Sequence, residues 1–366
     1  MGRLMSLDAL RGFDMLWILY PTYPLLHTLL VALGLKGCGL DLQMTHPAWI
    51  GFTFYDTIFP LFLFIAGVSW PFSLAAQRAR GVPTWKTCLK IVKRAVVLLV
   101  LGWIVGGILQ FRLDCVYTWN ALGVIGVSWA FAAFICLMCG LRGRVIAFGA
   151  ILLGWWALLR FVAAPGSPEG VNPILSAETC LCGWVDSNFL TFRRQPEAGF
   201  AVIGATATAL LGTFAGDFLR SARFGAAQKA KGLALAAAAA LLLGLAVAFG
   251  FGPYSMPVIK TAWTSSFVLV AGAYSLGMLA LFYWIIDVKG FTRWSFPLKV
   301  VGMNAVFAYC ASRTVFPWKV EMNFLFGGLM SLFPAGWDAF VGETCYVVVY
   351  WLLLLMMYRK GIFLKA

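Results

Sequence analysis

Charge is scarce in this chain of 366 residues: charged residues make up 11% of it, against 62% for hydrophobic residues. The mean hydropathy is +0.88. Soluble domains are about half apolar and about a quarter charged, so this composition excludes a soluble globular protein. The bilayer must act as the solvent for most of the chain, which predicts an all-α polytopic membrane protein.

Several signatures of other protein classes are missing. The N-terminal MGRLMSLDALRGFDMLW has no small-residue cleavage site, so we expect no cleavable signal peptide. The sequence contains no G-x-S-x-G elbow, no P-loop and no H-E-x-x-H. These absences argue against a serine hydrolase, an ATP-driven transporter and a zinc protease. The spacing of cysteine and histidine is also poor for a metal site, and we expect none.

Ten apolar segments are about twenty residues long, which is enough to cross the hydrocarbon core as a helix. A shorter apolar piece, 323–334, is predicted to be interfacial or re-entrant. The ten predicted spans lie near 10–33, 50–75, 92–110, 120–139, 145–163, 199–219, 230–250, 262–286, 297–317 and 343–359.

Basic residues outnumber acidic ones by 28 to 14. In a membrane protein this excess first reports orientation, because cytoplasmic loops are enriched in lysine and arginine. Most of the basic residues fall on one side of the predicted spans, which predicts that both termini are cytoplasmic. The longest polar stretch, about 164–198, is then extracytoplasmic. No basic cluster is interleaved with stacking aromatics, so a nucleic-acid partner is not expected.

Four of the 9 cysteines are predicted to lie on the outward side. An oxidising exterior permits disulfides among them, but their spacing does not define a pairing, and free thiols remain the alternative. These four are Cys38, Cys115, Cys180 and Cys182.

Ionisable residues within apolar spans are costly and usually face a bundle interior or a water-filled cavity. Asp217 and Asp287 lie at cytoplasmic helix ends beside basic residues, so we expect them to form structural ion pairs. Asp8 and Arg11 are three residues apart and would be neighbours on a helix. For that pair a structural role and a ligand-binding role both remain open.

The chain has only two histidines, and His46 lies at the outer edge of the second predicted span. Imidazole is the side chain best suited to exchange a proton near neutral pH, so His46 is the candidate catalytic residue. The alternative is an interfacial histidine without a role. A helix beginning at Pro47 would place Asp56 roughly 15 Å from His46, too far for a hydrogen bond. We expect Asp56 and Asp14 to help build a polar cavity.

Six blocks of the sequence resemble the heparan-α-glucosaminide N-acetyltransferase family of multi-span transmembrane acyltransferases. The segment from His46 matches the family pattern H-x-x-W-x-G-x-x-x-x-D-x-x-F-P-x-F-x-F-I-x-G-x-S. The blocks follow the family order and extend over almost the whole chain. They are RLMSLDALRGFDML (3–16), HPAWIGFTFYDTIFPLFLFIAGVS (46–69), PEAGFAVIGATATALLGTFAG (196–216), KTAWTSSFVLV (260–270), IIDVKG (285–290) and GMNAVFAYC (302–310).

The resemblance implies that acetyl-CoA enters from the cytoplasmic side and that its acetyl group passes to an amino sugar across the membrane. His46 corresponds to the family's catalytic histidine. It would act as a general base or carry the acetyl group itself, and we favour direct transfer. The expected acceptor is the terminal glucosamine of a glycosaminoglycan or envelope glycan. A bacterial inner membrane is the expected location, and the family's architecture suggests a homodimer.

The resemblance also points to supporting residues. Thr22 stands where the family has an asparagine, and Trp263 and Asn304 lie in matched blocks. We expect them to line or support the cavity together with Asp14 and Asp56. The phosphates of CoA require basic partners on the inner rim, although each such residue also fits the plain positive-inside signal. The candidates for donor binding are Arg11, Arg78, Lys86, Arg94 and Lys289.

We therefore predict one transmembrane acyltransferase domain over residues 1–366, with an extracytoplasmic loop at about 164–198. One alternative is an O-acyltransferase of envelope polysaccharide, which would not require an amine in its acceptor. Another is a transporter of sugar or acyl donor that performs no chemistry. Broken helices and an internal repeat would favour transport, and the sequence has no convincing repeat.

Overall fold

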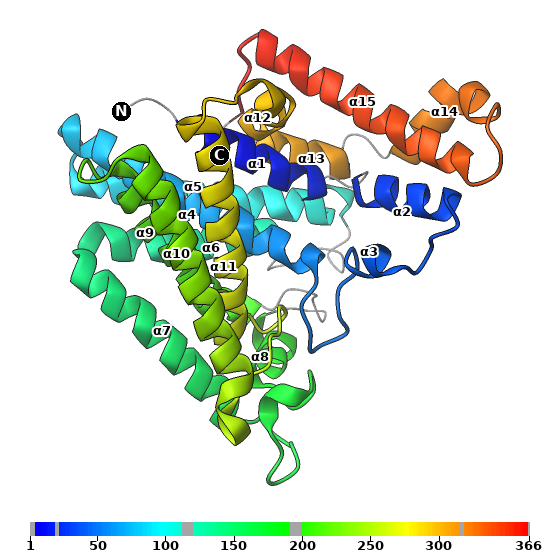
Figure 1. The fold of residues 1–366 in the computed structure, drawn as a ribbon. Coiled ribbons are helices and arrows are strands. Elements are labelled where there is room, and N and C mark those ends of the chain that lie inside the picture. The colour runs from blue at the N-terminus through cyan, green and yellow to red at the C-terminus, as the bar shows by residue number, and fades with distance from the viewer. Residues whose placement is uncertain (1–3, 19–21, 112–119, 191–198, 315–317, 365–366) are drawn as a thin grey trace. The chain divides into compact units, whose positions relative to one another are not determined.

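The computed structural model describes residues 4–18, 22–111, 120–190, 199–314 and 318–364. Throughout these ranges the regular structure is helical, apart from one isolated antiparallel bridge between Ala163 and Cys180 (Figure 1). The predicted all-α class is therefore confirmed. The chain forms two compact units. One functional domain over the whole chain stays a prediction. The first unit contains Met1–His46, Thr53–Ile58 and Phe282–Ala366, and the second contains Pro47–Phe52 and Phe59–Leu281.

The first unit is built from helices of both chain ends. Its helices are α1 (Met5–Ile18), α2 (Thr22–Ala32), α3 (Gly39–Leu42), η1 (Phe54–Thr57), η9 (Tyr283–Val288), η10 (Arg293–Ser295), α12 (Phe296–Met303), α13 (Ala305–Thr314), α14 (Trp318–Met330) and α15 (Trp337–Arg359). Helix α14 covers most of the apolar piece predicted as interfacial or re-entrant.

The second unit holds the middle of the chain. Its helices are α4 (Ile58–Ala79), α5 (Thr84–Gly106), η2 (Ile108–Gln110), α6 (Ala121–Met138), α7 (Leu141–Phe161), η4 (Pro173–Leu175), α8 (Leu181–Val185), η5 (Asp186–Leu190), η6 (Gly199–Ala201), α9 (Val202–Arg220), α10 (Ala226–Leu245), η7 (Ala246–Gly250), η8 (Gly252–Tyr254) and α11 (Ser265–Phe282). Figure 1 shows α10 running alongside α11, and Gly244 of α10 contacts Val270 of α11.

Seven helical stretches in the described part of the chain are long and apolar enough to cross a membrane, and each overlaps a predicted span. This result supports an integral membrane protein. The seven stretches are Phe54–Ala79, Ala121–Met138, Leu141–Phe161, Gly199–Arg220, Ala226–Gly250, Ser265–Val288 and Trp337–Arg359.

The other three predicted spans are interrupted or more highly charged. Segment 92–110 falls in α5, whose first half is rich in lysine and arginine. Segment 10–33 contains α1 and α2, which have 14 and 11 residues. At about 1.5 Å per residue, neither reaches the roughly 30 Å of the hydrocarbon core. Segment 297–317 is interrupted at Asn304. A total of ten spans therefore stays a prediction, as does the cytoplasmic placement of both termini.

Small residues of the segment GATATALLGTFAG let α4 and α9 pack at close range within the second unit. Gly212 lies against the carbonyl of Phe64, and Gly216 lies against the carbonyl of Val68. A side chain at either glycine would overlap main-chain oxygen. In the most apolar stretch of the helical segment that contains α9, 78% is buried, whereas the corresponding share for α10 is 22%. The alanine-rich α10 is therefore the lipid-facing helix of the two.

Glycines also permit close packing in the first unit, where α1 crosses α12. Gly12 lies against the main chain of Leu298, and Gly302 lies against the carbonyl of Asp8. The predicted neighbours Asp8 and Arg11 form an ion pair with 3.3 Å between Oδ1 and Nη1. These contacts determine the position of α1, which carries Asp14.

The described cysteines that are predicted to lie on the outward side are free thiols. Cys38 is half-buried, while Cys180 and Cys182 are buried. Cys115 lies outside the described residues. Among the described positions the structure therefore follows the free-thiol alternative.

Asp186 is a buried carboxyl within the predicted extracytoplasmic stretch. It is 4% exposed and accepts a hydrogen bond of 2.9 Å from the backbone N–H of Phe200. Burial raises its pKa to about 6, and the N–H groups of Phe200 and Gly199 only partly oppose this effect. The folded protein therefore binds this proton more tightly than the unfolded chain does.

Replacing Gly212 with alanine should lower the free energy of unfolding by about 1–3 kcal/mol, because the added methyl group overlaps a carbonyl oxygen. Gly149→Ala on α7 is the matched control, since no atom lies within 4 Å of its added carbon. The control should be neutral or slightly stabilising. Unfolding in detergent, followed by tryptophan fluorescence, measures both variants. Equal stability of the two would contradict the close packing of α4 and α9.

Asp186 should make stability depend on pH. Its contribution is full below the ordinary pKa of 3.8 and is lost as the pH rises through about 6. Asp186→Asn should remove this decline and raise the free energy of unfolding at pH 7 by on the order of 3 kcal/mol. Stabilities of wild type and variant at pH 4, 5, 6 and 7 give the comparison. Parallel curves for the two proteins would show that Asp186 is not the responsible group.

Candidate active site

The segment after His46 is a loop. Residues 47–53 are not helical, and the chain becomes helical only in the 3-10 turn η1, before α4 begins at Ile58. Gly51 has a φ of 143°, a conformation that favours glycine. The expectation that a helix begins at Pro47 and separates His46 from Asp56 is therefore wrong. His46 and η1 both belong to the first unit.

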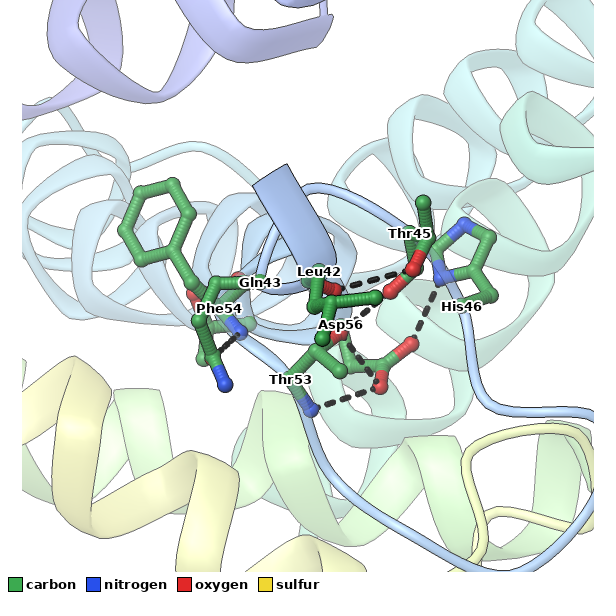
Figure 2. A network of polar contacts seen from close by, with 8 residues as sticks. Leu42, Gln43, Thr45, His46, Thr53, Phe54 and Asp56 are labelled. Carbon is green, nitrogen blue, oxygen red and sulfur yellow. Dashed lines mark hydrogen bonds and ion pairs between the residues drawn. The ribbon is translucent and has the colours of Figure 1, made fainter. Parts of the chain in front are cut away.

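The loop brings His46 and Asp56 into direct contact. Figure 2 shows the His46 ring pointing at the Asp56 carboxylate, with 2.7 Å between Nδ1 and Oδ1. The Asp56 side chain is 1% exposed, whereas that of His46 is 45% exposed. The pair therefore consists of a buried carboxylate and a partly exposed imidazole.

Thr53 holds the second oxygen of the carboxylate. The Thr53 backbone N–H donates to Asp56 Oδ2 at 3.0 Å, and the Thr53 hydroxyl lies 3.1 Å from the same oxygen. That hydroxyl also lies 2.8 Å from the carbonyl oxygen of Thr45. Its single proton can serve either acceptor. The Thr53 side chain thus connects the two ends of the loop on either side of the carboxylate (Figure 2).

Further contacts hold the residues before the loop beside those after it. Gln43 accepts hydrogen bonds from Phe54 N–H through its side chain at 2.9 Å and from Tyr55 N–H through its main chain at 3.1 Å. The Tyr55 ring centroid lies 4.8 Å from that of His46. Phe54 packs edge-on against Trp17 of α1 at 5.0 Å. The His46 ring is therefore held by its hydrogen bond to Asp56 and by packing against Tyr55.

The tryptophan of the H-x-x-W motif anchors the loop itself. Trp49 donates its indole N–H to the carbonyl of Ile174 in η4 at 2.9 Å. Gly51 donates its N–H to the carbonyl of Val258 at 3.0 Å. These residues all belong to the second unit. The H-x-x-W motif thus contains both the candidate base His46 and a tryptophan that fixes the loop.

The second histidine makes an analogous pair. His27 of α2 lies 2.8 Å from Asp41 of α3, between Nδ1 and Oδ1, and Gly37 N–H donates to the other oxygen at 2.9 Å. The bond from His27, followed by that from Gly37, lowers the pKa of Asp41 below its ordinary value. Asp41 therefore remains a carboxylate at neutral pH and ties α3 to α2. Helix α3 leads directly into the residues before His46.

The geometry at His46 defines what the site can do. An ionised carboxylate only accepts hydrogen bonds, so Nδ1 of His46 must carry a proton in the pair. In the neutral ring Nε2 is then the nitrogen that can accept a proton, and the side chain as a whole is 45% exposed. A buried carboxylate in this position also stabilises the imidazolium that forms when Nε2 accepts a proton. The arrangement suits a general base for a nucleophile that approaches from outside the loop.

The other predicted cavity residues have mainly structural contacts. Trp263 is 2% exposed with a φ of 47°, and its indole N–H donates to Thr208 at 3.0 Å. Asn304 accepts from Leu364 N–H and donates to the carbonyl of Ile362, both at 3.0 Å. Trp263 thus supports the second unit, and Asn304 fastens the C-terminal segment of the first. A role for either toward substrate stays a prediction.

Asp14 and Thr22 remain open as site residues. Asp14 is fully buried in α1, and neither of its carboxyl oxygens has a hydrogen-bond partner within the described ranges. Thr22 begins α2, and its side chain lies outside what the structure describes.

The predicted donor-binding residues do not form one cluster within the second unit. Arg78 lines a cavity whose wall includes neither Lys86 nor Arg94. Lys86 is exposed and lies over the Trp85 ring, while Arg94 lies 4.2 Å from the centre of the Trp129 ring. In the first unit, Arg11 pairs with Asp8, and Lys289 lies 5.4 Å from the Trp284 ring centre.

Sequence reasoning missed Thr53, Gln43 and Tyr55. Thr53 carries a usable signal, because T-x-x-D before an apolar run is typical of a helix N-terminus. That pattern would have placed the start of the helix after residue 53. Gln43 and Tyr55 carry no comparable pattern, since their contacts arise only when the loop closes.

Comparison with known proteins confirms the resemblance at a distant level. The chain is 24% identical to the mouse protein named heparan-alpha-glucosaminide N-acetyltransferase over 384 residues, which is 87% of this chain. It is 23% identical to the human protein of the same name over 382 residues, or 88% of this chain. The matches cover 55% of each relative, so the chain spans about half the length of these curated relatives. No protein-family model matches the chain.

The two histidines should both occupy the Nδ1–H form when neutral, because each Nδ1 faces a carboxylate. Nitrogen NMR of protein labelled only at histidine can resolve two such rings. Asp56→Asn should release His46 into a mixture of tautomers and leave the His27 signal unchanged as an internal control. An unchanged His46 signal in this variant would refute the assigned pair.

Proposed function

We propose that this chain is a membrane acetyltransferase that moves the acetyl group of acetyl-CoA to the amine of an extracytoplasmic amino sugar. The observation that carries the proposal is the His46–Asp56 hydrogen bond of 2.7 Å within the H-x-x-W segment. The distant similarity to two proteins named as N-acetyltransferases supports the reaction class. The apolar helices support its location in a membrane.

The proposed step is direct transfer with both substrates bound. The sugar amine attacks the thioester carbonyl, a C–N bond forms, and the C–S bond breaks. The amine proton passes to Nε2 of His46, and the same proton then protonates the departing thiolate to give CoA. Asp56 holds the ring through Nδ1 and stabilises the imidazolium between these two transfers. Asp56 is thus a positioning residue, and His46 is the catalytic one.

The acceptor class follows from the chemistry of this base and from the relatives' name. A glucosamine amine is partly protonated near neutral pH, so a base beside it increases the reactive fraction. We propose a terminal glucosamine of a glycosaminoglycan or envelope glycan, at a bacterial inner membrane. The homodimer suggested by the resemblance stays a prediction.

One feature of the fold is also known from transporters. Helices α12 and α13 are interrupted at Asn304, and transporters often use interrupted helices to bind their cargo. Here, however, the Asn304 side chain is bonded at both ends to the C-terminal segment. The polar atoms of the Asn304 side chain thus have partners within the chain, and this observation does not favour transport.

His46→Ala should reduce acetyl transfer from labelled acetyl-CoA to glucosamine by about 10²–10⁴-fold, the usual contribution of a general base. Asp56→Asn should cause a smaller loss, because the ring remains but its orientation is less defined. Transfer is measured with purified protein, alongside its melting temperature and its binding of CoA. A folded His46→Ala protein that turns over normally would disprove the catalytic role.

Two controls separate the reaction classes and the role of the ring. N-acetylglucosamine offers hydroxyls but no amine, so it should accept no label from an N-acetyltransferase. Added imidazole should partly restore transfer by His46→Ala if the ring acts as a base. Label on N-acetylglucosamine would instead establish O-acylation.

A further inference from the structure

A cavity of about 480 Å³ lies in the second unit, where the ends of α4, α6, α7 and α9 meet. Its wall contains the guanidinium groups of Arg78, Arg144 and Arg220 and the carboxylate of Asp217. Three cations against one anion leave an excess of two positive charges. The remaining wall is largely apolar, with Leu74 among its members. The volume suits a small molecule or a lipid headgroup.

Arg144 is the most enclosed cation of this wall. Its side chain is only 9% exposed, and its Nη2 lies 2.7 Å from Asp217 Oδ2. Its Nη1 faces the Cys136 sulfur at 3.4 Å, which is a weak acceptor. Its Nε has no hydrogen-bond partner in the described part of the chain. Arg144 thus has one strong partner, Asp217, and it adds positive charge to the wall of the cavity.

The other two arginines are less constrained. Arg220 lies 3.7 Å from Asp217, and its side chain is 45% exposed. Arg78 is exposed, and within the described ranges it forms no ion pair. Asp217 is therefore shared by Arg144 and Arg220, as its predicted structural role implies, while Arg78 is left for a ligand. Planar guanidinium groups bind phosphate oxygens in pairs of parallel hydrogen bonds.

The start of α7 adds backbone donors to the same wall. Gly140 lines the cavity and is the N-cap of this helix of 21 residues, but it has no side chain to cap the helix. The first N–H groups of α7 therefore lack an intrahelical acceptor. No atom lies within 4 Å of a carbon added at Gly140, so the approach is open. An anion at this helix end is favoured by both the donors and the helix dipole.

We propose that this cavity binds the phosphate groups of an anionic ligand, held by Arg78, Arg144 and Arg220 and the first turn of α7. Two sources share this chemistry: the phosphates of CoA and the headgroup of an anionic phospholipid. The CoA source rests on the proposed function, whereas the lipid source does not. The helix ends involved are those that the charge asymmetry predicts to be cytoplasmic.

Binding of CoA and of inorganic pyrophosphate to the full chain in neutral detergent, without acceptor, tests this site. Arg78→Gln and Arg220→Gln should each weaken binding by about tenfold, as expected for the loss of one charge-assisted contact. Arg80→Gln and Arg142→Gln are matched controls, because both residues are exposed, lie next to the cavity in sequence and are not part of its wall. The controls should retain wild-type affinity.

Asp217→Asn tests whether removing a negative charge from the wall strengthens phosphate binding. Removing the competing carboxylate should tighten phosphate binding, whereas a merely damaged cavity would bind more weakly. Melting temperatures are compared for all variants, since Arg144 and Asp217 also support the fold. Weaker binding by a folded Asp217→Asn protein would overturn the proposal.

Nanodiscs distinguish the two sources. Stabilisation by phosphatidylglycerol over phosphatidylcholine that disappears in Arg78→Gln identifies a lipid headgroup, while loss of CoA and pyrophosphate binding identifies the donor. If the arginine variants change neither the stabilisation by phosphatidylglycerol nor the binding of CoA and pyrophosphate, the proposal is wrong, even if His46-dependent transfer is intact. If pyrophosphate binds as expected but wild-type protein transfers no acetyl group, the cavity stands and the proposed function fails.

Discussion

The buried carboxylate of Asp56 is the group on which the geometry of the candidate site depends. A carboxylate that is 1% exposed must have its oxygens satisfied, because desolvation of an unpaired charge is very costly. One oxygen receives the His46 ring and the other receives the Thr53 N–H. The bond to His46 requires the chain to double back between residues 46 and 53, and the bond from Thr53 caps the start of η1. The same requirement that orients the imidazole therefore also shapes the loop and sets the start of the next helix.

Within each of the two units, helices reach close packing through glycines at the points where they cross. Gly212 and Gly216 bring α9 onto α4, and Gly12 and Gly302 bring α1 onto α12. In lipid such close contact replaces the hydrophobic driving force that soluble helices use. The carboxyl oxygens of Asp14 have no hydrogen-bond partner within the described ranges, but other polar groups inside each unit are bonded to the protein. Trp263 and Asn304 show this, because their polar atoms are bonded to neighbouring residues.

Much of the fold was accessible to sequence reasoning, and the failures have specific causes. Seven predicted spans overlap long apolar helices, because hydropathy over about twenty residues is a strong signal. The segment from residue 46 was misjudged because its apolar composition was interpreted as helix from Pro47 onward. The pattern T-x-x-D at Thr53 pointed to a later start. The small residues of α9 permit close packing, but only the structure shows that α4 is the partner of Gly212 and Gly216. Arg144 and Arg220 were seen only as orientation signals, because nothing local shows that two helix ends share a cavity with Arg78.

By itself the sequence determined the membrane class and most of the apolar helices, and it made His46 the candidate for proton transfer. These properties depend on composition, on segment length and on the chemistry of one side chain, all of which are local. Only the tertiary structure decided that His46 contacts Asp56, that His27 contacts Asp41, and that three arginines surround one cavity. Each of these contacts joins residues on different turns, loops or helices. Their distances are set by chain reversal and helix crossing, which depend on many weak contacts that no short stretch of sequence contains.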